Sequence, residues 1–544
     1  MMGAEKLRVL RTHPGGAGKL IGWLVFCLWL QLSTAPGVAA GPAKQSADLN
    51  VVYLWVDTLR ADHLGCYGYG RETSPNLDRL AGESVVFENA YTPHTVTLTS
   101  FMSITTSLYP FSHGVLYVAK DRLAPKIRTL PEILQLYGYR TVWFGPAKDP
   151  HLSPEVGFGR GFDELHDFDK DLAVTRGRIL KTLESVKDRK FFLNVHTYHV
   201  HSPYTPGEAA RSRFTVRKAL GLPETEDDIK RAAVAMMKMA VVENRGPGVE
   251  VLGEKAIGEL AAGDIFGGGE GVDVPADRVR DFLDAKGMIY KYDDILNYAY
   301  DSKLKPDDPE VMDYAKALYD AEIYEYDTEI LGPLLEKLKE LGLYEKTMVV
   351  LIADHGEEFG EHGGVTHGKT LYEEVVHIPW IMRIPGQPGK RIAALVQTVD
   401  IMPTILGELG IPLPHQAQGL DFSPTIRGLA QEKSRAFVYG QMPWQISIRS
   451  GRWKIQFFKG TDTQDGVGDY LKRIFFSRKE LFDLATDPHE RHNLHPAQND
   501  RFDALFHSYQ VWESSLPNYR DADYDFHPSL DAKTIEKIKK TGYW

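Results

Sequence analysis

The sequence predicts an α/β fold, with a large, mostly parallel sheet between two layers of helices and a small antiparallel C-terminal subdomain. Apolar, β-branched runs typical of strands buried on both faces lie at residues 48–57, 140–144, 190–195, 347–354 and 378–384. Helical patterns alternate with these runs, which favours a parallel sheet. One follows the expected cap Ser74 over residues 75–80, and another spans residues 311–341 before Gly342. From about residue 434 the strand patterns are short and alternating, which predicts the antiparallel subdomain.

The composition is that of a globular protein. The chain has 544 residues, of which 43% are apolar and 25% are charged, and this length suits one large domain and a smaller one. The formal net charge is −11 and no basic stripe is present, so we expect no nucleic-acid partner. The two cysteines, Cys27 and Cys66, cannot form a disulfide framework or a cysteine-rich metal site.

The N-terminal segment predicts export. Basic residues precede an apolar run over residues 20–32, and small residues follow at 37–43, a pattern typical of a cleavable signal peptide over about residues 1–40. The run is shorter than the roughly 20 residues that a membrane-spanning helix needs. We therefore expect a periplasmic or extracellular protein with no stable membrane span after signal cleavage.

A long insertion interrupts the alternation of strands and helices. We expect a catalytic domain over residues 48–433 and the C-terminal subdomain over residues 434–544. Within the first, residues 208–306 are far longer than an ordinary connection. An acidic helical pattern, clustered glycines and several tyrosines favour an inserted cap or lid. A packed addition without a function is an equally weighted alternative.

Two aspartates at strand ends suggest a metal site. Asp57 and Asp354 each end a predicted buried strand, and the carboxyl ends of parallel strands are where ligands gather. With His355, and with His367 and Lys369 nearby, they favour a divalent cation bound by oxygen and nitrogen donors. The alternative is that both aspartates only cap the helices that follow.

Residues 93–110 are rich in threonine and serine. A hydroxyl at a helix N-terminus can act as a nucleophile, because the free N–H groups there favour the anion that forms. The alternative is that these hydroxyls only cap a short helix or bond back to its carbonyls. Composition alone favours that alternative.

Longer motifs follow one another in a recognisable order. They include residues 50–92 (NVVYLWVDTLRADHLGCYGYGRETSPNLDRLAGESVVFENAYT), SLYPFSHGV, GYRTVWFG, FFLNVHTYHVHSPY, LIADHGEEFGEHG, HGKTLYEEVVHIPWIMRIPG and LFDLATDPHERHNL. Together they resemble the sulfatase family, within the alkaline-phosphatase superfamily, from about residue 50 to residue 494 apart from the insertion. The resemblance implies a mixed, mostly parallel sheet and ester-hydrolase activity.

The resemblance also implies a departure at the nucleophile. The family makes a formylglycine nucleophile from a Cys or Ser at the position of Thr97, and a threonine cannot become one. The arginine of the same motif is replaced by Phe101, whereas its serine is kept as Ser100. Thr97 itself is therefore the expected nucleophile.

A second departure adjoins the first aspartate, where Thr58 stands at a position that is often aspartate in the family. Fewer carboxylates make an oxygen-rich calcium cage less complete. We expect one divalent metal, with zinc preferred and calcium possible, held by Asp57, Thr97, Asp354 and His355. This set resembles that of the threonine-nucleophile phosphatases, nucleotide phosphodiesterases and phosphoethanolamine transferases of the superfamily.

The same resemblance assigns roles to further polar residues. We expect His367, Lys369 and His201 to be catalytic, holding the anionic group and protonating the leaving oxygen. The expected substrate-binding residues are His199, Ser100, His151 and Lys148.

Two further predictions place residues away from the chemistry. Alternation along a strand predicts that His196 faces away from His199 and His201, as a core histidine. The three glutamates that follow His355 are predicted to form a solvated helix face: Glu357, Glu358 and Glu361.

These residues predict a metal-dependent hydrolase of anionic esters with Thr97 as its nucleophile. Because Thr97 replaces the formylglycine precursor, phosphate mono- or diesters are favoured over sulfate esters. The substrate is expected to be a small anionic ester or a glycan or lipid headgroup. The alternatives are a sulfuric ester hydrolase that uses Thr97, a phosphoethanolamine-type transferase, and a catalytically dead binding protein.

Overall fold

The computed structural model describes residues 48–117, 121–146, 156–169, 171–215, 222–223, 225–243, 247–262, 275–285, 296–431, 434–458 and 478–519. The predicted signal peptide, Lys148 and His151 lie outside the described residues. Among the residues that are described, every helix is too short or too polar to cross a lipid bilayer.

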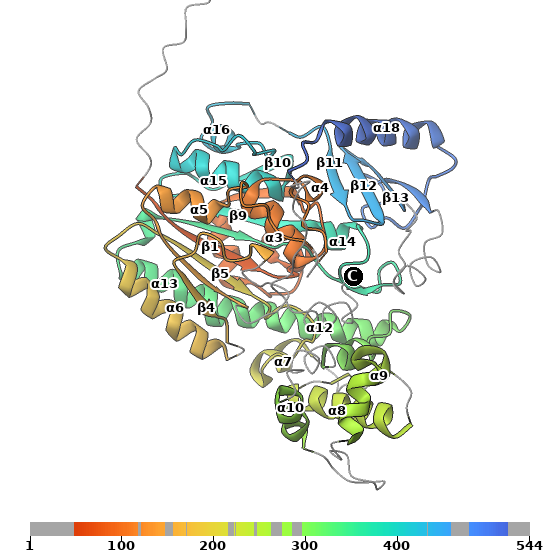
Figure 1. Ribbon diagram of the computed structural model, residues 1–544. Coiled ribbons are helices and arrows are strands. Elements are labelled where there is room, and N and C mark those ends of the chain that lie inside the picture. Colours follow the sequence, from red (N-terminus) through yellow and green to blue (C-terminus); the bar gives the residue numbers. More distant parts are fainter. Residues whose placement is uncertain are drawn as a thin grey trace, which may run out of the picture. The chain divides into compact units, whose positions relative to one another are not determined.

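An eight-stranded sheet in the order β10-β2-β9-β6-β1-β5-β3-β4 forms the centre of the fold (Figure 1). Strand β1 (Asn50–Val56) is buried along its whole length and pairs in parallel with β5 (Phe191–Thr197) and β6 (Thr347–Ile352). The other strands are β2 (Val85–Tyr91), β3 (Arg140–Gly145), β4 (Glu164–Asp167), β9 (His377–Arg383) and β10 (Lys390–Gln397). Only β9 runs antiparallel to its neighbours in this sheet. The mixed, mostly parallel sheet is therefore confirmed.

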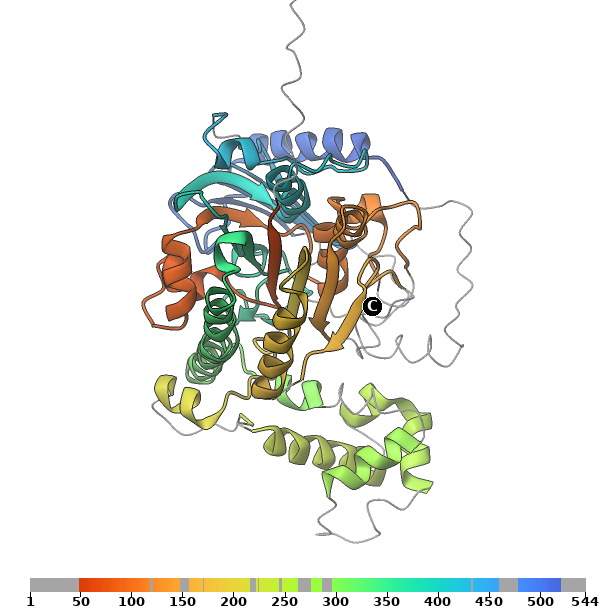
Figure 2. The ribbon, with the colours of Figure 1, turned by 90° about the vertical axis from the view of Figure 1, so that its left-hand side faces the viewer.

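Helices cover both faces of this sheet, which explains the continuously apolar strands (Figure 2). One layer contains α2 (Pro75–Gly82), α6 (Leu172–Val186), α12 (Pro309–Glu325) and α13 (Gly332–Glu340), and the other contains α3 (Thr97–Thr106), α5 (Leu130–Leu136) and α15 (Ile401–Leu409). A π-helical turn, η5 (Tyr326–Leu331), joins α12 to α13. The predicted helix over residues 311–341 is thus confirmed, and Gly342 after it has the left-handed φ of 66° expected of a helix terminator.

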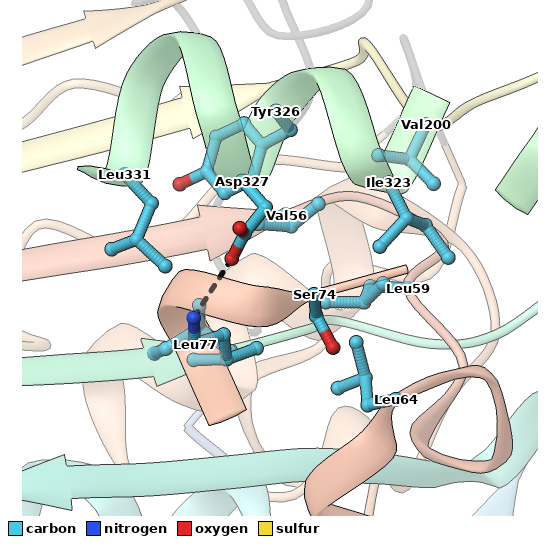
Figure 3. Close-up of a pocket in the computed structure, with 11 residues that line it drawn as sticks. Val56, Leu59, Leu64, Ser74, Leu77, Val200, Ile323, Tyr326, Asp327 and Leu331 are labelled. Carbon is cyan, nitrogen blue, oxygen red and sulfur yellow. Dashed lines mark hydrogen bonds between the residues drawn. The ribbon is translucent and has the colours of Figure 1, made fainter. Parts of the chain in front are cut away.

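The contact between η5 and α2 corrects one prediction. The side chain of Ser74 does not cap α2. Instead Asp327 of η5 accepts the N–H groups of Asn76 and Leu77, each at 2.8 Å; Figure 3 shows the bond from Leu77. Burial raises the pKa of Asp327 to about 6. A small, mainly apolar pocket beside this carboxylate is lined by Val56, Leu59, Leu64, Ser74, Leu77, Val200, Ile323, Tyr326, Asp327, Leu331 and Leu351 (Figure 3). Its lining identifies it as a packing space between helices and sheet.

The C-terminal part forms the predicted antiparallel sheet. Its strands, in order, are β11 (Val438–Gln441), β12 (Gln445–Ser450), β13 (Trp453–Phe458) and β14 (Lys479–Asp483). Helix α18 (Asn499–Ser515) packs on β12 and β13. Aromatic residues of the helix, Phe502 and Tyr509, share one buried cluster with Ile448 and Ile455 of the sheet.

The insertion is helical where it is described. It contains α7 (Glu208–Phe214), α8 (Glu226–Glu243), α9 (Pro247–Ala262) and α10 (Ala276–Ala285). Its buried apolar residues, such as Ile229 and Leu283, belong to the same hydrophobic cluster as the central sheet. The domain boundaries and the role of a lid stay predictions.

Candidate active site

Three buried metal-binding side chains meet where two neighbouring strands end. Asp57 directly follows β1, and Asp354 and His355 follow β6. Because β1 and β6 are adjacent and parallel, their carboxyl ends lie at the same edge of the sheet. All three side chains are fully buried, and one ligand atom from each lies within 4.8 Å of the others.

The hydrogen bonds of this cluster leave lone pairs that face each other. Nδ1 of His355 donates to the Gly356 carbonyl at 3.0 Å, so its Nε2 carries a lone pair. Oδ1 of Asp354 accepts the N–H groups of His355 and Thr58, at 2.9 and 3.3 Å. Oδ2 of Asp354 lies 3.4 Å from His355 Nε2, and neither atom has a hydrogen-bond partner among the described residues.

Two such acceptors in a dry interior are costly unless a cation or proton lies between them. The donors therefore fit a divalent metal that accepts both oxygen and nitrogen ligands. The bond from His355 to a backbone carbonyl is the outer contact that usually orients a ligating histidine. The residues Asp57, Asp354 and His355 would hold the metal.

The prediction of His196 as a core histidine is confirmed, but the residue also contacts a predicted metal ligand. The residue is fully buried on β5 and its ring stacks on Trp55 at 4.2 Å, but its Nε2 lies 3.2 Å from Oδ2 of Asp57. It therefore adjoins the metal cluster. Strand alternation does not relate His196 to His199 and His201, because β5 ends at Thr197 and both of these residues lie after the strand. Burial, together with His201 and His355, lowers the pKa of His196 to about 3.

Phe101, which the sequence resemblance aligns with the arginine of the family motif, belongs to an aromatic cluster. Its ring stacks on Trp55 with a centroid distance of 4.9 Å and contacts Phe158 at 4.0 Å. Trp55 lies between Phe101 and His196, so an apolar wall backs the Asp57 side of the site.

Thr97 is the first residue of α3 and is 9% exposed. The residues just before it contact the turn of His367 and Lys369: Thr95 Oγ1 donates to the Thr370 carbonyl at 3.3 Å, and a Cβ added to Gly368 would lie 3.4 Å from Val96 Cγ2. The nucleophile candidate thus follows a loop that lies against that turn.

Ser100 is not placed to bind a substrate. It is fully buried and its hydroxyl donates to the His94 carbonyl at 2.7 Å. The predicted substrate-binding role is corrected to that of a residue that holds the loop before α3, because the hydroxyl proton is already used.

His367 and His201 are brought together with His355. Nδ1 of His367 lies 2.9 Å from Glu357 Oε1, and its ring centroid lies 4.4 Å from that of His355 and 4.8 Å from that of His201. Burial lowers the pKa of His367, and burial and His367 lower the pKa of His201 to about 4. His201 Nδ1 donates to the Ser202 carbonyl. The lowered pKa values favour the neutral form of both rings. In His201 the carbonyl partner makes Nδ1 the donor and leaves Nε2 as an acceptor, and His367 has the same tautomer when Glu357 is ionised.

The prediction that the glutamates after His355 form a solvated helix face is wrong. Glu357 and Glu358 are buried, and Glu358 begins a hairpin made of β7 (Glu358–Phe359) and β8 (Val365–Thr366). Glu361 accepts a bond from the Arg60 guanidinium at 2.8 Å. Gly360 and Gly363, with φ values of 83° and 78°, turn the chain where a helix would continue.

Lys369 and His199 occupy different surroundings. Lys369 Nζ is half-buried and donates to the Val365 carbonyl at 2.8 Å and to Thr366 Oγ1 at 3.1 Å, on the same turn as His367. His199 Nε2 instead lies 3.2 Å from Glu325 Oε2 at the end of α12. The structure therefore ties His199 to the helical layer and shows no contact between it and the metal cluster within the described part of the chain.

Two residues that the sequence analysis did not single out also lie here. His94 is 1% exposed, and burial and His355 lower its pKa to about 3. Asp301, near the end of the insertion, accepts the Ser202 hydroxyl at 2.5 Å. Burial raises the pKa of Asp301 to about 6; the charge of Glu357 also raises this pKa, and that of Lys369 lowers it. No local pattern could reveal either residue, since both reach the site only through tertiary contacts.

Comparisons with known proteins give a consistent family. The profile described as "Sulfatase" matches residues 49–411, and that described as "N-sulphoglucosamine sulphohydrolase, C-terminal" matches residues 360–508. Arylsulfatase A of Homo sapiens is 24% identical over 492 residues, 86% of each chain. An N-acetylglucosamine-6-O-sulfatase of Bacteroides thetaiotaomicron is 23% identical over 534 residues, 89% of each chain. The solved phosphonate monoester hydrolase of Agrobacterium radiobacter has a TM-score of 0.61 at 20% identity, covering 86% of this chain and 95% of that chain.

The first of these profiles covers well over half of the sequence, and the solved relative shares the fold. Enzymes of this family are generally metal dependent, and the buried cluster after β1 and β6 offers suitable ligands. The chain belongs to the sulfatase family of ester hydrolases, within the alkaline-phosphatase-like superfamily.

Proposed function

We propose that the protein is an exported, metal-dependent hydrolase of phosphate mono- or diesters that uses Thr97 as its nucleophile. The observation that supports the proposal is that the hydroxyl of Thr97 begins α3, after a loop that lies against the turn of His367 and Lys369. The resemblance of the sequence aligns this residue with the position at which the family forms formylglycine. A threonine gives a stable alcohol nucleophile, which suits phosphoryl transfer. We further propose a glycan or lipid headgroup as the natural leaving group.

The metal would be held by Asp57, Thr97, Asp354 and His355, with zinc preferred. When bound, it supplies positive charge beside the oxygens that gain negative charge in the reaction. The free N–H groups at the start of α3 act in the same direction, because the helix N-terminus favours negative charge.

The protein's own residues then move the protons. Thr97 Oγ1 bonds to phosphorus and the bond from phosphorus to the leaving oxygen breaks. The Thr97 proton passes to Nε2 of His201 or His367, both neutral acceptors, and from there to the leaving oxygen. Water next attacks phosphorus and the bond to Thr97 breaks, so that Thr97 recovers a proton. Lys369 contributes charge that holds the anionic group.

A sulfuric ester hydrolase that uses Thr97 is the second candidate. The observation that favours it is the family itself: relatives named as sulfatases cover 86–89% of the chain. The same residues would act, with sulfur in place of phosphorus. Substrate assays separate the two candidates.

The test is metal analysis of the purified full chain, together with rates on nitrophenyl phosphate, bis-nitrophenyl phosphate and nitrophenyl sulfate. We expect phosphate-ester turnover that falls by about 10³-fold or more in Thr97→Ala, with metal retained. Thr105→Ala is the matched control, because among the described residues this hydroxyl on the same helix bonds only to the Phe101 carbonyl, at 2.8 Å. Turnover of the sulfate ester alone would favour the second candidate. No turnover of any ester by the metal-loaded chain would favour a dead binding protein.

A further inference from the structure

The loop between β2 and α3 holds His94 in one position. The carbonyl of His94 accepts the hydroxyls of Thr92 and Ser100, at 2.9 and 2.7 Å. Those two hydroxyls lie 3.1 Å apart, and both side chains are buried. Two hydrogen bonds to its carbonyl therefore hold the backbone of His94 in place.

The imidazole of His94 is left with one unused donor. Its Nδ1 accepts the Val96 N–H at 3.1 Å, so in the neutral ring the proton is on Nε2. The residue is 1% exposed, and Nε2 has no hydrogen-bond partner among the described residues. A buried N–H without an acceptor is costly, and native proteins rarely keep one unless a ligand completes it.

The proton on Nε2 excludes metal ligation by this atom. A nitrogen that carries a proton has no lone pair to offer, so Nε2 of His94 differs from Nε2 of His355, which has one. The loop also lies at the right place for a substrate contact: it leads directly into Thr97 and packs against the turn of His367.

We propose that the Nε2–H of His94 donates to a non-bridging oxygen of the ester's phosphoryl or sulfuryl group. This deepens the proposed function and rests on it. The contact supplies a donor to an anion-binding site in which the motif's arginine is replaced by Phe101, a residue committed to the aromatic cluster. A fixed donor of this kind stabilises the charge that develops on the oxygen during transfer.

The test removes the donor at the Nε2 position and keeps the loop, because the NH2 group of an asparagine would lie closer to the backbone than Nε2 of the histidine does. In His94→Asn, the amide oxygen can accept the Val96 N–H as Nδ1 does, since asparagine commonly bonds to the backbone N–H two residues on. His113 offers a matched control: its Nδ1 accepts the Val115 N–H at 3.1 Å in the same pattern, but its Nε2 is already 3.1 Å from Ser103 Oγ. The measurements are metal content, melting temperature, kcat on the nitrophenyl esters, and calorimetric binding of inorganic phosphate and sulfate.

We expect His94→Asn to keep its metal and melting temperature, to lose about 10²- to 10³-fold in kcat and to bind the inorganic anions more weakly. His113→Asn should leave kcat and anion binding unchanged. Wild-type kcat and anion affinity in His94→Asn would overturn the inference, and so would loss of metal, which would make His94 a ligand. If the wild-type chain turns over no ester, the proposed function fails, and the anion-binding arm still decides whether His94 is a donor.

Discussion

At the scale of single residues, the positions of the protons on His355 and Asp354 decide whether the cluster can bind a metal. His355 uses its only N–H on the Gly356 carbonyl, and Asp354 uses one oxygen on two backbone N–H groups. The remaining nitrogen and oxygen lie 3.4 Å apart, and both are acceptors when the imidazole is neutral. A bound cation would remove this repulsion, so metal binding and folding stability should be linked.

Asp354→Asn tests that link. The amide keeps the shape and the backbone contacts but loses the negative charge of one ligand. We expect metal content to fall well below one ion per chain and the melting temperature to fall with it, because a ligand that binds only the folded state stabilises that state. Asp78→Asn, on α2, is a control for a half-buried carboxylate that lies outside the metal cluster. Full metal content and an unchanged melting temperature in Asp354→Asn would remove this residue from the ligand set.

The sequence revealed some of these residues and concealed others. Asp57 and Asp354 were predictable because each ends an apolar strand, and adjacent parallel strands bring their ends together. His94 was not predictable, because its role depends on two tertiary features. The Val96 N–H donates to Nδ1 of its ring, and burial leaves Nε2 without a partner among the described residues. Neither condition is visible in the residue types alone.

At the scale of elements, the β7–β8 hairpin arranges the catalytic turn. Glu357, directly before β7, lies 2.9 Å from Nδ1 of His367, which follows β8. Tyr204 donates to the other oxygen of Glu357 at 2.9 Å. Glu358 is buried beside them, accepts the Thr370 hydroxyl at 2.8 Å, and has its pKa raised to about 8 by burial and by Glu374. Sequence patterns predicted a helix here because three glutamates in five residues resemble a polar helix face.

Glu358→Gln tests the raised pKa of that carboxyl group. The folded protein holds a proton on Glu358 up to about pH 8, whereas the unfolded chain releases it near the ordinary glutamate pKa. Between those values the folded state binds more protons, so this residue's contribution to stability falls as pH rises. Melting temperatures of the two proteins should therefore be close at pH 5 and diverge by pH 9, with Glu358→Gln more stable. A constant difference across that range would show that Glu358 has an ordinary pKa.

At the scale of the whole molecule, the last part of the insertion contacts residues next to the candidate active site. Tyr300 packs edge-on against Tyr204 with ring centroids 5.8 Å apart, and Asp301 accepts the hydroxyl of Ser202 beside His201. The sequence predicted the insertion's length and its start after the motif of His201. It could not predict that the last part of the insertion returns to the site, because that depends on packing between segments a hundred residues apart.

These contacts show which part of the insertion a shortened variant has to keep. Replacing residues 216–295 with a Gly/Ser link keeps α7 and the segment of Tyr300 and Asp301. We expect turnover of nitrophenyl esters to be spared, and turnover of a larger phosphorylated or sulfated oligosaccharide to fall sharply, since remote contacts with a large substrate contribute to its turnover. Metal content and a cooperative melting transition establish that the variant folds. If such a folded variant loses small-ester turnover as well, the removed helices are part of the catalytic core.

The account depends most on Thr97 as the nucleophile, and one measurement tests this directly. The full, metal-loaded chain is mixed with nitrophenyl phosphate, quenched in acid within the first turnovers, digested and analysed by peptide mass spectrometry, with Thr97→Ala treated in the same way. The account predicts a phosphoryl group on Thr97 in the wild-type chain and none on the corresponding peptide of Thr97→Ala. Turnover with Thr97 unmodified, or with the phosphoryl group on Thr95 or Thr99, would contradict it.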